Sequence, residues 1–523
     1  MPKSQYQSRN YQYKYHRFDF SGHRFAYIDY NSNVPFRRKL DKLLLPVLLV
    51  CFCSLRLFGI FGDFSNSDAW RWHHRSESFY QGLRQGNLKE IYQRYHPGVS
   101  LMWLTTGVRV GLQAYTQITH TEYKTLENVE GYVLLDGLCK VAIILVLSSL
   151  VIWQVRTLTE LYNGTAALLY FLLISFEPFV IGIDRWYHIT SLEVYLAFTA
   201  FLLTLKWTKS QNTKTLIVAG VFMGLALLTK FSSGVTFLLL LIMVVWQHKN
   251  QLRLVLKPVL ALVVPALLII LLFFPALWLY PGYVFSKLIE HSQETFGGNY
   301  ATVVFAQNYP VLYYPVVLLL KLSPIAVILL LVALVSSVSS QKRILFWPVG
   351  YILLYLLVFT LADQKIERYA ISVMPALLMI IAVALSHLTP KLISVISLII
   401  ILTGGAIYLS YFPYPALYYS PAVAGVAGVY KSGLLDTNGE YFSDAARYLN
   451  MKGRDVVVHT AANEQSFKPY FKGIYASEYS SQVQYVITSV DSTRGAASFP
   501  ACPVAEKVFL VDGLAYVTIW SCF

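Results

Sequence analysis

The chain has 523 residues, of which 56% are hydrophobic and only 13% are charged. Soluble domains are about a quarter charged, so this composition excludes a soluble multidomain protein and predicts a polytopic membrane protein. The formal net charge is +14, but the basic residues lie in an N-terminal tail and in short loops between apolar segments, where they set membrane orientation. We therefore expect no nucleic-acid binding. Five cysteines without CxxC spacing are too few for a disulfide scaffold.

Residues 1–42 hold nine Lys and Arg against three Asp. We expect a basic cytosolic tail rather than a cleaved signal peptide, because the apolar segment that follows is long and is succeeded by many more. A membrane-spanning helix needs about 20 apolar residues, and this length predicts about eleven crossings. The predicted segments are 43–61, 131–153, 164–183, 189–205, 215–229, 231–247, 255–280, 313–338, 344–362, 370–388 and 392–411.

Lys and Arg fall in alternate connections between these segments, and the positive-inside rule places those connections and the N-terminus in the cytosol. The outer parts are then 62–130, the turns at 184–188 and near 230, 281–312, 363–369 and everything after 411. One alternative stays open: 215–247 could be a single tilted helix, which would invert every later assignment. The basic residues used are Arg156, Lys206, Lys209, Lys214, Lys249, Arg253, Lys257, Lys342, Arg343 and Lys391.

Two outer regions have a pattern of their own. The stretch "HPGVSLMWLTTGVRVGL" (96–112) opens with Pro and Gly and predicts an interfacial or re-entrant helix, with a full span as the alternative. After 412, "YFSDAARYLN" has helical spacing, and "DVVVHT", "QYVITSV" and "LAYVTIW" are short β-type runs. We therefore predict an all-α transmembrane domain over 43–411 and a small extracytoplasmic α/β domain over 412–523, where Cys502 and Cys522 could form a disulfide.

Ionisable residues at the outer ends of the apolar segments predict one polar cleft at the outer membrane boundary. Charges at membrane depth are costly and mark a cavity or a paired site. Asp68, Lys230 and Arg368 are least explained as ordinary loop charges, because they stand at the mouth of an apolar segment or within one. Cations beside apolar grooves suit the phosphate of a lipid, and a nearby carboxylate can accept a proton from an attacking hydroxyl. The other predicted members are Arg71, Arg75, Glu77, His96, Asp184, Arg185, His188, His291, Asp363, Lys365 and Glu367.

A metal site in this region is the weaker hypothesis. His73 and His74 are adjacent and would diverge by about 100° on a helix. His73 and Glu77 would share a face, which Asp68 could approach, but two or three mixed ligands are a weak signal for a divalent metal. The sequence contains neither a Walker loop nor a GxGxxG element, so no nucleotide is expected.

Several motifs in order resemble the GT-C superfamily of integral-membrane glycosyltransferases. They are "SDAW" (67–70), "YHPGVSLMW" (95–103), "GLALLTKFSSG" (224–234), "YYPVVLLLKLSP" (313–324), "ERYAISVMPAL" (367–377) and "YFPYPALYYSPAVAGVAG" (411–428). The similarity runs from about residue 43 to 411 and is nearest to the branch of dolichyl-phosphate-mannose protein mannosyltransferases and lipid A aminoarabinose transferases. It implies a polyprenyl-phosphate sugar donor and transfer with inversion on the extracytoplasmic face.

The resemblance also implies roles for single residues. Asp68 would be the catalytic base or would orient the acceptor, Lys230 and Arg368 would hold the lipid phosphate, and His96 would shape the cleft. Family members commonly have a second acid after the first, but this chain has Ala69. Either another acid, Glu77 or Glu90, substitutes for it or one carboxylate suffices.

The sequence thus predicts a membrane glycosyltransferase that acts on a lipid, glycan or protein acceptor. Arg71 and Arg75 would contact the donor phosphate as well, and the cleft would include His96, Glu77, Glu90, Arg185, His188 and Tyr369. One rival is a lipid or solute transporter, although no inverted repeat is visible and the charges favour one face over the midplane. A second rival is a scaffold for surface-polymer assembly.

Overall fold

Apolar helices occupy each of the predicted membrane segments in the computed structural model. The structure describes residues 45–63, 66–94, 96–122, 126–297, 303–336, 345–490, 492, 499 and 501–522, so the predicted basic tail lies outside it. The helices over the predicted segments are α2 (Leu45–Leu57), α5 (Val129–Leu161), α6 (Gly164–Phe176), α7 (Pro178–Asp184), α8 (Ile189–Ser210), α9 (Thr213–Thr229), α10 (Gly234–Gln247), α11 (Leu256–Phe273), α12 (Pro275–Leu279), α15 (Tyr313–Lys321), α16 (Pro324–Ser336), α17 (Phe346–Leu361), the 3-10 helix η7 (Glu367–Val373) with α18 (Met374–Leu385), and α19 (Pro390–Tyr411).

By length and composition, five helices of the described chain can cross a membrane, or up to eight spans result if each of three bent helix pairs is one span. Shorter apolar helices, at Thr213–Thr229, Phe231–Gln247 and Phe346–Leu361, cover the remaining predicted segments. The prediction of a helical multi-pass membrane protein is confirmed.

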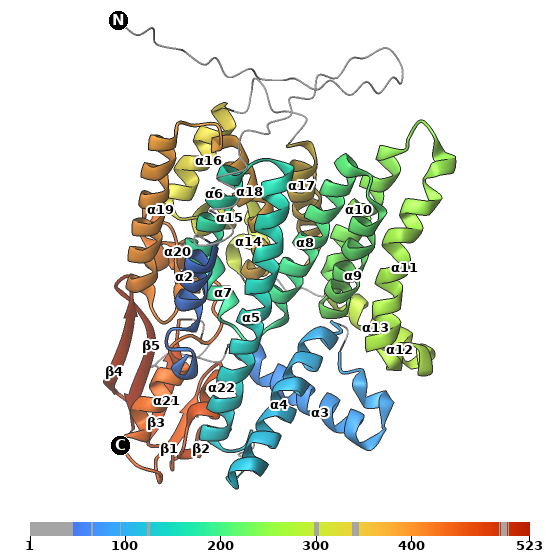
Figure 1. Cartoon of the computed structure of the whole chain (residues 1–523). Helices are drawn as coiled ribbons and strands as arrows, with labels where there is room; N and C mark the ends of the chain where they lie inside the picture. Colours follow the sequence, from blue (N-terminus) through green and yellow to red (C-terminus); the bar gives the residue numbers. More distant parts are fainter. Residues whose placement is uncertain are drawn as a thin grey trace, which may run out of the picture. The chain divides into compact units, whose positions relative to one another are not determined.

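The chain reverses direction at Lys230, between α9 and α10. Gln247 Nε2 at the end of α10 donates a hydrogen bond to the carbonyl of Thr208 (3.2 Å), close to the end of α8. The rings of Trp207 and His248 are 5.9 Å apart at their centroids. The last turns of α8 and α10 therefore lie at the same end, with α9 packed against α8 and α11 (Figure 1). The alternative of one long helix over 215–247 is excluded.

The helices of the first outer region, α3 (Ser67–Gln85) and α4 (Val99–Thr119), lie at one end of the apolar helices, drawn at the bottom of Figure 1. α4 packs on α3, α5 and α9 and is not among the described helices apolar enough to span a membrane. This agrees with the interfacial interpretation of 96–112. An apolar cluster that includes Phe79, Met102 and Leu228 joins α3 and α4 to α9, and it also includes residues of α12 and of α13 (Pro281–Gly297).

The C-terminal part forms a five-stranded sheet in the order β2-β1-β3-β5-β4. β1 is parallel to β2 and β3, and β5 is antiparallel to β3 and β4. The predicted helix is α21 (Phe442–Asn450), and the three predicted β-type runs correspond to β1 (Val457–Thr460), β3 (Tyr485–Ser489) and β5 (Leu514–Ser521). Sequence patterns did not predict β2 (Ile474–Tyr475) or β4 (Val504–Val511). The expected disulfide between Cys502 and Cys522 is present.

Residues 49–523 form one compact unit. The C-terminal part contacts the first outer region through Tyr470, whose hydroxyl donates to the carbonyl of Asp63 (2.8 Å). A second contact is the ion pair of Lys472 Nζ with Glu130 Oε1 (3.1 Å). The boundary at 412 stays a prediction.

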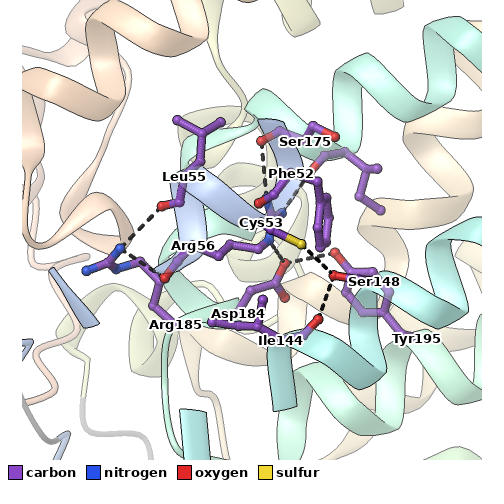
Figure 2. Close-up of polar contacts among 11 residues, drawn as sticks. Phe52, Cys53, Leu55, Arg56, Ile144, Ser148, Ser175, Asp184, Arg185 and Tyr195 are labelled. Carbon is purple, nitrogen blue, oxygen red and sulfur yellow. Dashed lines mark hydrogen bonds and ion pairs between the residues drawn. The ribbon is translucent and has the colours of Figure 1, made fainter. Parts of the chain in front are cut away.

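A buried arginine connects α2 to the bend between α6 and α7. Pro178 lacks a backbone N–H, so the carbonyl of Ile174 has no helical donor four residues later. Arg56 Nη2 donates to that carbonyl (3.0 Å). Its Nη1 donates to the carbonyl of Ser175 (3.3 Å), and Figure 2 shows Arg56 beside the labelled Ser175 and Asp184. Arg56 Nε also pairs with Asp184 Oδ2 (2.8 Å), and both side chains are fully buried. The guanidinium thus provides the hydrogen-bond donor that Pro178 cannot provide to the Ile174 carbonyl at this bend.

We expect Arg56→Met to lower the free energy of unfolding by about 3–5 kcal/mol, because Asp184 would stay buried without its charge partner. The double variant R56M/D184N should lose less than the sum of the two single variants, since it buries no unpaired charge. Thermal unfolding in detergent measures both effects. As a control, replacing the exposed Arg84 by Met should change stability by less than about 0.5 kcal/mol. Additive losses in the double variant would contradict the proposed coupling.

Candidate functional site

Asp68 lies in the first turn of α3 because Asn66 starts the helix there. The Asn66 side-chain oxygen accepts hydrogen bonds from the backbone N–H groups of Asp68 and Ala69, each at 3.0 Å. Asn is a favoured N-cap residue, and an acidic side chain in the first turn is stabilised by the helix dipole. The local sequence "NSDA" therefore fixes both the start of α3 and the place of the carboxylate.

The Asp68 carboxylate meets cationic and imidazole groups from three elements. Its Oδ2 lies 2.7 Å from Arg368 Nη2 of η7 and 3.6 Å from His188 Nε2, which precedes α8. Its Oδ1 lies 3.4 Å from Arg71 Nη1 on the same helix. The Asp68 side chain is 19% exposed and that of Arg368 is 16% exposed. The pair is thus partly shielded but open on one side.

The protonation states of this group follow from its contacts. Burial raises the pKa of Asp68, but Arg368, His188 and Arg71 together lower that pKa well below its usual range. Burial lowers the pKa of His188 to about 4, although Asp68 acts in the opposite direction. His188 Nδ1 accepts from the backbone N–H of Thr190 (3.2 Å), so the proton of the neutral ring is on Nε2, toward Asp68. At neutral pH the site holds a carboxylate, two guanidinium groups and a neutral histidine.

Lys230 adds a buried ammonium beside this group, in the turn between α9 and α10. Its Nζ lies 4.3 Å from the centroid of the Tyr369 ring, which follows Arg368 in η7. Burial lowers the pKa of Lys230 to about 8, and Glu193 partly offsets the effect. Glu193 Oε1 accepts hydrogen bonds from Ser232 (2.9 Å) and Ser233 (3.3 Å), which follow Lys230 in the turn. Glu193 was not predicted as a site residue.

His96 and Arg75 lie at the edge of the same group. Burial lowers the pKa of His96 well below its usual range, and the nearby Lys230, His188, Arg368 and Arg75 lower it further. Arg75 places its guanidinium over the Trp72 ring, 4.6 Å from the centroid. The predicted residues Asp68, Arg71, Arg75, His96, His188, Lys230, Arg368 and Tyr369 are therefore neighbours through direct or electrostatic contacts.

Gly98 explains how α3, α4 and the Lys230 turn come together. Its backbone is left-handed (φ 61°), and a Cβ at this position would lie 2.1 Å from Cζ3 of Trp72. Its N–H donates to the carbonyl of Thr229 (3.1 Å), next to Lys230. Trp72 is only 2% exposed, so the absence of a side chain at Gly98 lets α4 begin directly against a buried ring of α3.

Two predicted cleft residues, Glu77 and Arg185, have other partners in the structure, and a third, Glu90, is exposed. Glu77 forms an ion pair with Arg109 of α4 and accepts a hydrogen bond from Gln81 (2.7 Å). Arg185 pairs with Asp63 (3.0 Å) and donates to the carbonyls of Leu55, Arg56 and Phe58. Glu90 is exposed in η4 (Leu88–Ile91). Their positions at loop ends could not reveal these partners, because sequence spacing does not specify tertiary contacts.

The three side chains considered as metal ligands diverge. His73 Nε2 lies 2.9 Å from Asp136 Oδ1, and Lys140 Nζ lies 2.7 Å from Asp136 Oδ2, all buried between α3 and α5. Asp68 and Glu77 have the partners described above. Among the residues that the structure describes, no group of three or more His, Cys, Asp or Glu is arranged to hold a metal ion. The buried triad of His73, Asp136 and Lys140 was missed, although Asp136 and Lys140 are charges within an apolar segment.

Residues 135–279, which include His188 and Lys230, match the family model described as dolichyl-phosphate-mannose-protein mannosyltransferase. Over these residues the match agrees with the predicted resemblance to dolichyl-phosphate-mannose protein mannosyltransferases. A comparison with curated protein sequences gave no match.

The solved structures similar to this chain include ArnT and an archaeal oligosaccharyltransferase. ArnT from Cupriavidus metallidurans bound to undecaprenyl phosphate is 14% identical, with a TM-score of 0.49 over 93% of this chain and 98% of that one. The oligosaccharyltransferase of Archaeoglobus fulgidus in complex with Zn and sulfate is 11% identical, with a TM-score of 0.43 over 85% of this chain and 68% of that one.

We expect Gly98→Ala to destabilise the site, because an alanine would be strained at positive φ and would clash with Trp72. The loss should be about 1–3 kcal/mol. Gly107→Ala is a matched control in the same helix, since a Cβ there meets nothing within 4 Å. That change should be neutral or stabilising by about 0.5–1 kcal/mol. The melting temperatures of both variants in detergent measure this difference. Equal shifts in the two variants would contradict the proposal that Gly98 is required for the contact with Trp72.

Proposed function

We propose that this protein transfers a sugar from a polyprenyl-phosphate donor to an acceptor at the outer membrane boundary, with inversion at the anomeric carbon. The observation that supports this most is the contact of Asp68 with Arg368 and His188, with Lys230 beside them, at one end of a set of apolar helices. These residues come from elements far apart in the sequence. The family match supports a glycosyltransferase, and the mixture of cations and a carboxylate supports a lipid-phosphate donor.

The cationic groups suit a phosphodiester whose lipid chain stays in the bilayer. The Arg368 guanidinium can contact phosphate oxygens through two N–H groups, and the Lys230 ammonium adds a point charge. Arg71 is half exposed, and we place it with Arg75 at the entrance, where they would attract the donor headgroup. The leaving lipid phosphate gains negative charge as its bond to the sugar breaks, so these cations stabilise the transition state more than the ground state.

Asp68 is the group proposed to act on the acceptor. The acceptor oxygen forms a bond to the anomeric carbon, the bond from that carbon to the phosphate oxygen breaks, and the acceptor proton passes to Asp68. While Asp68 is paired with Arg368, its pKa is held too low for efficient proton transfer. A donor phosphate would compete for Arg368 and so raise the basicity of the carboxylate. His188, with its Nε2–H toward Asp68, would keep the carboxylate oriented during this exchange.

The orientation belongs to this proposal as well. The distribution of basic connections favours a cytosolic N-terminus, and the Asp68 group and the C-terminal sheet would then face the extracytoplasmic side. The protein would act in the cell membrane, and its partners would be the lipid-linked sugar and a lipid, glycan or protein acceptor. No nucleic-acid partner is expected.

We expect Asp68→Asn to bind donor but to lose about 10²–10⁴-fold in transfer rate, the usual contribution of a general base. The purified protein would be offered a panel of polyprenyl-phosphate sugars, and donor turnover would be followed by mass spectrometry. Arg84→Gln is the control on the same helix, because Arg84 is exposed, and it should stay within a few-fold of the native rate. Full activity in the Asp68 variant would remove Asp68 from the mechanism. Failure of the native protein to turn over any donor would refute the proposed function.

Donor binding should weaken as pH rises through about 8, the pKa of Lys230, because the ammonium is charged only below it. If donor binding requires one proton on Lys230, the affinity falls by up to about tenfold for each pH unit above the pKa. A bound donor anion raises the pKa of Lys230 and so moves this fall in affinity to higher pH. Because the donor is a phosphodiester, its own charge does not change in this range. Titration with a fluorescent polyprenyl-phosphate sugar from pH 6.5 to about 9.5 measures the effect.

The matched variant for this titration is Lys230→Arg, which stays charged throughout and should bind with little pH dependence. Arg368→Ala should weaken donor binding at every pH. A native binding curve that is flat to the upper end of the range, or Lys230→Ala and Arg368→Ala variants with native affinity, would disprove the phosphate assignment.

A further inference from the structure

A short segment of the C-terminal part, residues 436–440, contacts the backbone on both sides of the Asp68–Arg368 ion pair. Asp436 Oδ2 accepts a hydrogen bond from the backbone N–H of Glu367 (3.1 Å), which immediately precedes Arg368. The carbonyl of Asn438 accepts one from the backbone N–H of Ser67 (3.1 Å), which immediately precedes Asp68. Two hydrogen bonds from one segment thus hold the residues adjacent to the two charged partners.

The segment is itself fixed to the C-terminal sheet. Glu440 Oε2 accepts from the backbone N–H of Asn438 (2.8 Å) and from the hydroxyl of Tyr516 on β5 (2.9 Å). Gly439 has a φ of +87°, and a Cβ there would lie 2.0 Å from Ser466 Oγ of α22 (Glu464–Phe467). Asn438 and Glu440 are buried. The position of 436–440 is therefore determined by contacts within the C-terminal part.

On the membrane side, the start of η7 is held in the same way. The Glu367 carboxylate pairs with Lys321 Nζ (2.8 Å) and accepts a hydrogen bond from the Tyr419 hydroxyl. Its backbone N–H is the group bound by Asp436. Asp436 also lies close enough to Arg368 to interact with it electrostatically. The main chain that carries Arg368 is thus fixed by side-chain contacts from the C-terminal part and from α15.

We propose that residues 436–440 set the separation of Asp68 and Arg368, with Asp436 as the positioning residue. The inference rests on the proposed function and extends it to the C-terminal part. It also bears on the question raised by Ala69: Glu77 pairs with Arg109 and Glu90 is exposed, so neither replaces the second acid, and Asp436 acts through the position of its oxygen and not through its charge. Displacement of a reacting group by about 1 Å can cost a hundredfold in rate, so holding both partners in place matters for transfer. The hydrogen bonds of residues 436–440 to Glu367 and Ser67 are called the clamp below.

Two substitutions at Asp436 separate the position of its oxygen from its charge. Asp436→Asn keeps an acceptor oxygen in place for the Glu367 N–H but removes the charge, and it should retain kcat within about threefold of native. Asp436→Glu keeps the charge but moves the oxygen by one methylene, and it should lower kcat about 10–100-fold with donor affinity changed less than threefold. The opposite order, with the Glu variant active and the Asn variant impaired, would overturn the positioning role, as would native kcat in both.

Asp512 provides the matched control. It is another aspartate of the C-terminal part that accepts a backbone N–H, that of Val426 (2.8 Å), and a tyrosine hydroxyl, that of Tyr411 (2.7 Å). Asp512→Asn and Asp512→Glu should leave kcat within about twofold of native. If Asp512→Glu lowers kcat as much as Asp436→Glu, the effect reflects general loosening of the C-terminal part and the proposal fails.

A second measurement does not depend on the enzyme reaction. Hydrogen–deuterium exchange should rise at least threefold in peptides covering 366–373 and 66–72 of Asp436→Glu, and should stay native there in Asp512→Glu. Unchanged exchange in both peptides of Asp436→Glu would refute the clamp whether or not the protein transfers sugar. Raised exchange in a protein that turns over no donor would keep the clamp and refute the proposed function alone.

Discussion

The ion pair of Asp68 and Arg368 is the contact on which the arrangement of the site depends. Each partner alone would be a charge at the edge of an apolar interior, where an unpaired ion is costly. Together, at 2.7 Å, they join the first outer helix to the entrance of a late membrane helix. His188 and Lys230 belong to two further segments that end at the same place. Pairing of these charges therefore keeps four distant parts of the chain in one site.

The sequence predicted well where the helices of this site lie in the chain and which of their ends carry the charged residues. Apolar length located the helices, and the alternation of basic loops assigned Asp68, His188, Lys230 and Arg368 to the same face, where the structure brings them together. Such patterns report which end of a helix a residue occupies. They do not report its rotation about the axis or its partner. For this reason Glu77 was assigned to the cleft, although its side chain pairs with Arg109.

Other parts of the site had no signal in the sequence. Trp72 is in a tryptophan-rich segment at a membrane boundary, and only the close contact with Gly98 shows that it is buried. Asp436 lies in a loop after the last apolar helix, with neither a motif nor a charge pattern around it. Its contact with Glu367 arises because the C-terminal sheet packs against the site. Contacts of that kind depend on the completed fold and cannot be inferred from local spacing.

The buried position of Arg56 has a consequence for biosynthesis. This arginine ends the first apolar helix, whereas its carboxylate partner, Asp184, follows 128 residues later in the chain. During synthesis, α2 therefore enters the membrane before its native carboxylate partner has been made. A charged side chain near a helix end can reach the aqueous interface in the meantime. Final docking of the first helix must then wait for the bend between α6 and α7, so the earliest membrane segment is among the later ones to reach its native environment.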